Sequence, residues 1–259
     1  MLTHGSIARD SDVLKNIFAL LPHDLIRHDI IPHVARDGLY VNRFWYNISF
    51  PCLLCDDRVH PELYDNVAIR GAAANGHDKV VALLLTDARV DPTAKDNEAI
   101  RWAAQNGHDK VVALLLTDTR VDPTVYDNAS IRWAAQNGQD KVVALLLANQ
   151  RVNPTASNND AIQWAALKGY DKVVELLLAD QRVDPTVDDN LPIRLAAKNG
   201  HDKVVELLLA DQRVDPTVRN NDAIQWAAIN GHAKVVELLL ADPRVKTTVN
   251  NVLDGLPRI

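Results

Sequence analysis

Apolar and polar positions along the chain recur with a period of 31 residues. Within each period, a short segment with isoleucine and paired alanines precedes a second segment that is rich in valine and leucine. A fixed period of this length predicts a repeat architecture, in which neighbouring copies cover each other's apolar surfaces. An Arg-Val pair marks the period without any insertion, beginning at Arg58, Arg89, Arg120, Arg151, Arg182, Arg213 and Arg244.

In the period that spans residues 87–117, the first segment predicts a short helix. Pro92 prevents helix formation across the preceding loop, because proline lacks the backbone N–H and clashes with the previous turn. Asp96 and Asn97 offer side-chain acceptors for the first free amides, so we expect them to cap a helix that starts near Asn97. Gly107 is placed as the left-handed residue that ends it.

The second segment predicts another helix, which Asp109 is placed to cap. Its valines and leucines cover more than half of its circumference, so both flanks need covering. Helices of about nine residues are marginal alone, and the helices must therefore be stabilised by stacking. We expect an all-α solenoid of six units with a length on the order of 50 Å.

The period divides the chain into three parts. We expect an N-terminal helical cap over 1–55, six repeats over 56–241, and a truncated capping repeat over 242–259. The apolar residues 50–54 fall one period before Val81 to Leu85, and they are interpreted as a degenerate last helix of the N-terminal cap.

Within the segment from Asp96 to Leu116, the residues that match a known repeat family are Ile100, Ala103, Ala104, Gly107, His108, Val111, Val112 and Leu114 to Leu116. At these positions the segment resembles an ankyrin repeat. The resemblance implies an ankyrin-type α-solenoid of stacked helix-turn-helix repeats with short β-turn or hairpin loops, which binds a protein on its concave face without catalysis.

Two departures from the ankyrin pattern affect the loop between units. The usual period is about 33 residues, so each unit here lacks about two, and we expect a short projecting finger. The usual Thr-Pro helix start is replaced by Asn-x-Ala, with a proline only at Pro192. This 31-residue form is similar to arrays in proteins of amoebae and of the large DNA viruses that infect them.

Charge and composition exclude several classes of partner. With a formal net charge of −6 and a pI of about 5.8, the chain has no general attraction to nucleic acid or to anionic membranes. The sequence shows neither a signal peptide nor an apolar segment long enough to span a membrane. Its two cysteines give no reason to expect a disulfide framework. We therefore expect an intracellular protein, cytoplasmic or nuclear.

Residues 21–48 resemble a shortened F-box. Leu21, Pro22 and Asp24 stand ahead of an amphipathic stretch, and Trp45 ends it, although Pro32 interrupts the second helical part. The resemblance implies docking of a Skp-type adaptor. The alternative function is therefore a substrate-recruiting adaptor of a cullin-type ubiquitin ligase; a plain helical cap explains the same apolar spacing.

No catalytic, metal-binding or cofactor-binding residues are expected. The chain has no nucleophile elbow, HExxH motif or phosphate-binding glycine loop. Cys52 and Cys55 lack the second cysteine pair that a structural zinc site needs. The histidines at one repeat position lie a helix spacing or more apart, too far to share a metal, and these are His77, His108, His201 and His232.

Tryptophan recurs at one position of the first helix and would form a row along the stack. We expect these side chains to pack in the core between repeats, in preference to forming an aromatic binding strip. The four residues are Trp102, Trp133, Trp164 and Trp226.

Positions that vary among the copies form two stripes, which the ankyrin resemblance places on the concave face. One stripe follows the loop tips, at Tyr64, Lys95, Tyr126, Ser157, Asp188, Arg219 and Asn250. The other follows the ends of the first helices, at Ala74, Gln105, Gln136, Leu167, Lys198 and Ile229. We predict a mixed apolar and basic partner-binding patch, which comprises Tyr126, Leu167, Tyr170, Lys198, Arg219 and Ile229.

Overall fold

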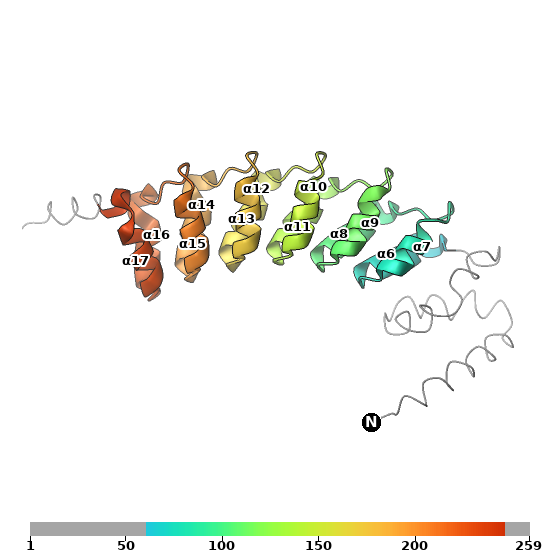
Figure 1. The fold of residues 1–259 in the computed structure, drawn as a ribbon, viewed down its shortest axis with the longest axis horizontal. Coiled ribbons are helices and arrows are strands. Elements are labelled where there is room, and N and C mark those ends of the chain that lie inside the picture. The colour runs from blue at the N-terminus through green and yellow to red at the C-terminus, as the bar shows by residue number, and fades with distance from the viewer. Residues whose placement is uncertain (1–60, 247–259) are drawn as a thin grey trace, which may run out of the picture.

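A computed structural model describes residues 61–246, which form a single row of stacked helix pairs (Figure 1). No β-strand occurs in this range. The first helices of the pairs are α6 (Leu63–Ala74), α8 (Ala94–Gln105), α10 (Val125–Gln136), α12 (Ala156–Lys168), α14 (Val187–Asn199) and α16 (Val218–Ile229). The second helices are α7 (Asp78–Leu84), α9 (Asp109–Thr117), α11 (Asp140–Leu147), α13 (Asp171–Ala179), α15 (Asp202–Ala210) and α17 (Ala233–Ala241).

The core repeats with the sequence period. In the third of these pairs, Ile131 and Ala134 of α10 and Val143 and Leu146 of α11 are fully buried. Leu147 is partly buried against the same core. Each helix therefore buries its apolar stripe against its own partner and against the neighbouring pairs, as the short helices require.

A left-handed turn of three residues opens every first helix in the described range. In α10 these residues are Tyr126, Asp127 and Asn128, with φ of 52°, 54° and 56°. Left-handed backbone is costly for residues other than glycine, and asparagine and aspartate adopt it most readily. The last two residues of each turn are an aspartate or asparagine followed by an asparagine. The left-handed backbone conformation explains why these residue types recur there.

The expected capping by this asparagine is wrong. Asn128 Oδ1 accepts a hydrogen bond from the backbone N–H of Asn153 in the next repeat at 2.8 Å. Because the turn is left-handed, the side chain leaves its own helix and reaches the neighbouring loop. The same bond, 2.8–2.9 Å long, joins Asn66 to Asp91, Asn97 to Asp122, Asn159 to Asp184, and Asn190 to Asp215.

The expected aspartate caps of the second helices are also wrong. Asp109 is the first residue of α9, while His108 holds the N-cap position without a side-chain cap hydrogen bond. Asp109 instead places a negative charge in the first turn, where it interacts favourably with the helix dipole.

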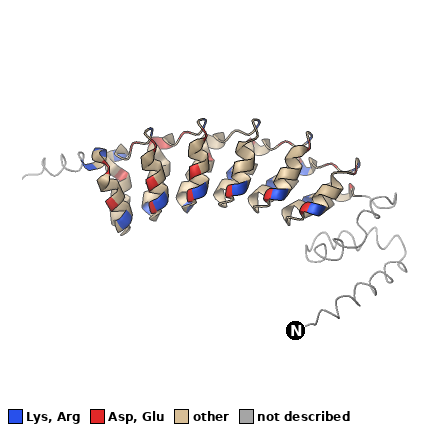
Figure 2. Ribbon diagram, viewed as in Figure 1, with Lys and Arg blue, Asp and Glu red and all other residues tan. Residues whose placement is uncertain are grey.

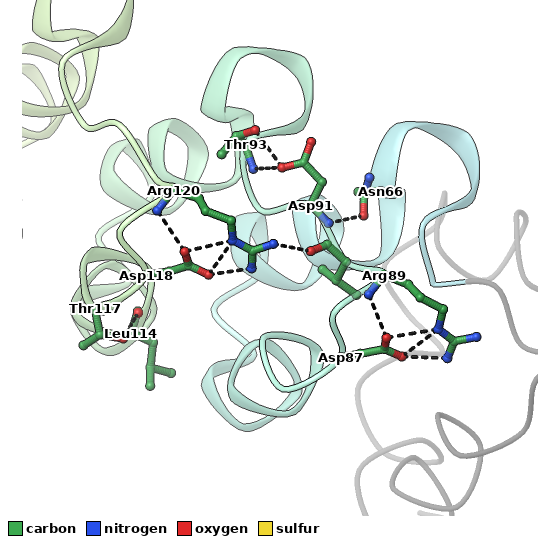
Figure 3. Close-up of polar contacts among 10 residues, drawn as sticks. Asn66, Asp87, Arg89, Asp91, Thr93, Leu114, Thr117, Asp118 and Arg120 are labelled. Carbon is green, nitrogen blue, oxygen red and sulfur yellow. Dashed lines mark hydrogen bonds and ion pairs between the residues drawn. The ribbon is translucent and has the colours of Figure 1, made fainter.

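The Arg-Val pair joins consecutive loops (Figure 3). The Arg120 guanidinium pairs with Asp118 at 2.7 Å and donates to the carbonyl of Val90, in the preceding loop, at 3.0 Å. Val121 is fully buried beside it. The strict recurrence of this pair therefore reflects a contact between loops.

The loop ion pairs predict a specific pH dependence of stability. Hydrogen bonds from Arg182 lower the pKa of Asp180 below its ordinary value of 3.8. A carboxyl whose pKa is lowered by folding stabilises the protein above its unfolded pKa, and this contribution disappears as the pH falls through the folded pKa.

We expect Asp180→Asn to lower the unfolding free energy at neutral pH by less than about 1 kcal/mol, because Arg182 is partly exposed. The difference from the wild type should vanish between about pH 4 and pH 2, as measured by urea unfolding. Asn149 occupies this position in another repeat and still accepts the Arg151 backbone N–H at 3.0 Å. A difference that persists at acid pH would contradict the ion-pair explanation.

The regular contacts between loops end near residue 246. Arg244 still donates to the Val214 carbonyl at 2.7 Å, but the Lys246 N–H bonds to the Asp242 carbonyl at 3.1 Å. Asn221 Oδ1 consequently has no hydrogen-bond partner among the described residues. The expected N-terminal cap, the F-box-like residues 21–48 and the C-terminal residues 247–259 lie outside the described range.

Candidate functional site

The tip row consists of the first residues of the left-handed turns. Tyr126 is 58% exposed, and its hydroxyl donates to Asp96 Oδ2 of the preceding repeat at 2.7 Å. Arg219 likewise donates from Nε to Asp189 Oδ2 at 3.0 Å. Both predicted site residues therefore lie on the surface, each linked to a carboxylate of the neighbouring tip. The row comprises Tyr64, Lys95, Tyr126, Ser157, Asp188 and Arg219.

The tips differ in charge along the array. Asp65 pairs with Lys95 at 2.7 Å, and this contact lowers the pKa of the Asp65 carboxyl. The hydrogen bond to Asp96, together with the nearby negative charge, instead raises the pKa of the Tyr126 hydroxyl. The charges of the Asp65 and Asp189 carboxylates are therefore balanced by Lys95 and Arg219. The Asp96 carboxylate has the neutral Tyr126 hydroxyl as its partner, so its negative charge is not balanced in this way.

Two further tip carboxylates have neutral partners. Asp127 Oδ2 accepts from the Ser157 hydroxyl at 2.6 Å, and Asp188 Oδ2 accepts from the Asn158 amide at 2.9 Å. Neither carboxylate forms an ion pair within residues 61–246. Negative charge therefore remains at the left-handed turns in the middle of the array, on the tip-row residue Asp188 and on Asp96 and Asp127, which follow tip-row residues.

Leu167, Lys198 and Ile229 occupy equivalent positions at the ends of three consecutive first helices, which we call the helix-end row. Ile229 is 80% exposed, while Leu167 is half-buried. Lys198 Nζ lies 5.2 Å from the centre of the Trp226 ring. The structure therefore brings these three predicted residues together as neighbours, apart from the tips.

Tyr170 lies between repeats and is only partly exposed. Its ring covers Gly138, and a Cβ atom added at Gly138 would lie 2.8 Å from that ring. His201 covers Gly169 in the same way, and its Nε2 lies 3.0 Å from the Leu167 carbonyl. Tyr170 thus occupies a stacking position, and the other five predicted residues are divided between two rows, with two at the tips and three at the helix ends.

The tryptophans are not in the buried core, contrary to expectation. Trp102 is 40% exposed, and the other three side chains are partly exposed. In α10 the core is filled by Ala134 and Ala135, and the preceding Trp133 is rotated by about 100° around the helix. Trp102, Trp133, Trp164 and Trp226 therefore form a tryptophan row along the edge of the first helices.

Arginines beside the tryptophan row were missed by the sequence analysis. Arg132 pairs with Asp160 of the next repeat at 3.0 Å. Arg101 has no such acid, because the residue of the next repeat that corresponds to Asp160 is Ala129. The Arg101 guanidinium instead lies 4.6 Å from the Tyr126 ring and 5.6 Å from the Trp133 ring. A spacing of 28 residues between arginine and acid was the signal that could have indicated the ion pairs.

The same arginine also holds the left-handed turn. Arg101 Nε donates to the Asp96 carbonyl at 3.1 Å and its Nη2 donates to the Lys95 carbonyl at 3.0 Å. The tip row and the tryptophan row are therefore adjacent parts of one surface.

A family model described as ankyrin repeats, in three copies, matches residues 125–189 and 162–251. Residues 125–251 are ankyrin repeats. The described helix pairs accordingly form an all-α, ankyrin-type solenoid, in which residues 61–124 have the same helix-pair arrangement.

Among solved structures, the ankyrin array is similar to an ankyrin repeat family protein from Legionella pneumophila. The two are 19% identical, the match covers 82% of this chain and 79% of that chain, and the TM-score is 0.45. No curated protein matches the sequence.

No helix within residues 61–246 is long and apolar enough to cross a membrane. In the same range, no three histidine, cysteine or acidic side chains come together as metal ligands could.

Proposed function

We propose that the ankyrin array binds a protein partner on a concave face formed by the first helices and the loop tips. Ankyrin repeats generally mediate protein–protein interaction. The observation that carries the proposal for this face is the row of partly exposed tryptophans between the tip row and the helix-end row. Tryptophan, tyrosine and arginine are the residues that most often dominate binding energy at interfaces.

The opposite side of the array has a different composition. Five of the six described second helices, α7 to α15, begin with an Asp-Lys pair, and α17 begins with Ala233 and Lys234, so charged residues lie at the same end of each (Figure 2). Such uniform charge suits a solvated surface, because aspartate and lysine are rarely buried in proteins. The tip and helix-end rows instead change residue type from repeat to repeat, as Tyr126, Lys198 and Ile229 illustrate.

Two exposed residues allow a test with little risk to folding. Affinity capture with the full chain, followed by mass spectrometry, should recover partners that are lost with the double variant Lys198→Glu, Ile229→Asp. Removing one buried hot spot typically weakens an interface by about 2 kcal/mol or more, or roughly 30-fold. Lys203→Glu, an exposed residue of α15, is the control and should retain the partners.

Circular dichroism of all three proteins checks that the fold is unchanged. If the double variant keeps every captured partner as well as Lys203→Glu does, binding on the first-helix face is wrong.

A further inference from the structure

The spacing of the tryptophan row suits an extended segment. Trp102, Trp133 and Trp164 occupy the same position in α8, α10 and α12, and packed helices lie about 8–10 Å apart. A polyproline II segment advances about 3.1 Å per residue, so three residues cover roughly one repeat. A segment along the array can thus place one side chain of each triplet on successive tryptophans.

The charges beside the row favour a basic segment. The carboxylates of Asp96 and Asp127, one repeat apart, accept hydrogen bonds only from the neutral Tyr126 and Ser157 hydroxyls among the described residues. Their carboxylates are exposed at the tips and form no ion pair within residues 61–246. A lysine or arginine in each triplet would supply the missing cations.

The nearest cation of the array does not occupy these positions. Arg101 stacks on the Tyr126 ring and donates to the Asp96 backbone carbonyl, whereas the Asp96 carboxylate accepts its hydrogen bond from the Tyr126 hydroxyl. At the other end of the row, two cations lie over Trp226, Arg194 at 5.1 Å and Lys198 at 5.2 Å from its ring, whereas within residues 61–246 a single cation, Arg101, lies over Trp133, at 5.6 Å. The first three tryptophans are therefore the part of the row that a basic segment fits.

We propose that the partner presents an extended, basic segment with one apolar and one cationic residue in each triplet. Its apolar side chains pack on Trp102, Trp133 and Trp164, and its cations meet Asp96 and Asp127. This inference rests on the proposed function, because it names the chemistry of the partner for the same face.

The test uses the full chain and two synthetic peptides, one with four Pro-Leu-Lys triplets and one with four Pro-Leu-Glu triplets. Calorimetric titration should show binding of the lysine peptide only. The double variant Asp96→Asn, Asp127→Asn should weaken it roughly tenfold, since exposed ion pairs contribute up to about 1 kcal/mol each. Asn158 and Asn220 occupy the same turn position naturally, so the fold tolerates these changes.

Asp171→Asn, Asp202→Asn is the matched control on the second helices, and it should bind the lysine peptide like the wild type. Trp102→Ala should also weaken binding, which a purely electrostatic attraction would not require. Equal binding of the glutamate peptide, or unchanged affinity of the Asp96→Asn, Asp127→Asn variant, would overturn the basic segment.

The two proposals fail in different ways. If capture of a partner depends on Lys198 and Ile229 but neither peptide binds, the partner chemistry is wrong and the binding face stands. If captured partners are insensitive to Lys198 and Ile229, the proposed function is wrong, whatever the peptides do.

Discussion

Replacing Gly138 by alanine should lower the unfolding free energy by about 2–5 kcal/mol. Gly138 has φ of +71°, which disfavours any L side chain, and a Cβ atom there would lie 2.8 Å from two carbons of the Tyr170 ring. The left-handed backbone alone costs about 1–2 kcal/mol. The remainder comes from displacing an aromatic ring that is packed between two repeats.

Gly231→Ala is the matched control. Gly231 has φ of +75°, but no atom outside its chain neighbours lies within 4 Å of an added Cβ. Urea unfolding followed by circular dichroism should therefore show only the backbone cost of about 1–2 kcal/mol for this variant. Equal losses for Gly138→Ala and Gly231→Ala would show that the Tyr170 ring moves aside without cost.

Replacing Asn159 by alanine should also destabilise the array by about 2–5 kcal/mol. Asn159 is only 8% exposed, and its Oδ1 accepts the Asp184 backbone N–H at 2.9 Å. Alanine leaves that amide without its acceptor, which costs about 1–3 kcal/mol, and it must also adopt the left-handed conformation, with φ of 59°.

Asn159→Gly separates the two contributions, because glycine adopts the left-handed backbone freely but cannot accept the hydrogen bond. We expect its loss of stability in urea unfolding to fall between those of the wild type and Asn159→Ala. Gln150→Ala, at an exposed loop position, serves as a surface control. Full stability of Asn159→Gly would mean that the bond between repeats contributes nothing.

The helical solenoid could be predicted from the sequence because its determinants are local and repeated. Pro92 and Gly107 separate two apolar segments of helical length, and 31-residue copies of those segments can bury their surfaces only by stacking. The ankyrin-type fold is confirmed by the match of residues 125–251. The period predicts the stacked helix pairs, whereas the ankyrin type was implied by the resemblance of the segment from Asp96 to Leu116.

Side-chain partners across repeats could not be predicted in the same way. Asn97 was expected to cap its own helix, but the left-handed turn directs it to the next loop. The tryptophans were expected in the core, but the paired alanines occupy that position and leave Trp102 partly exposed. Tyr170 was grouped with the surface residues, whereas its ring packs on Gly138.

The sequence by itself determined the helix pairs, their period and their stacking, because these follow from apolar spacing and from glycine and proline within one unit. Only the tertiary structure decided which side chains face solvent and which cross to the next repeat. The direction of a side chain depends on the backbone turn that carries it and on the neighbour that covers it, and residues of two repeats meet only after stacking. The tryptophan row and the negative tips at Asp96 and Asp127 are products of that stacking.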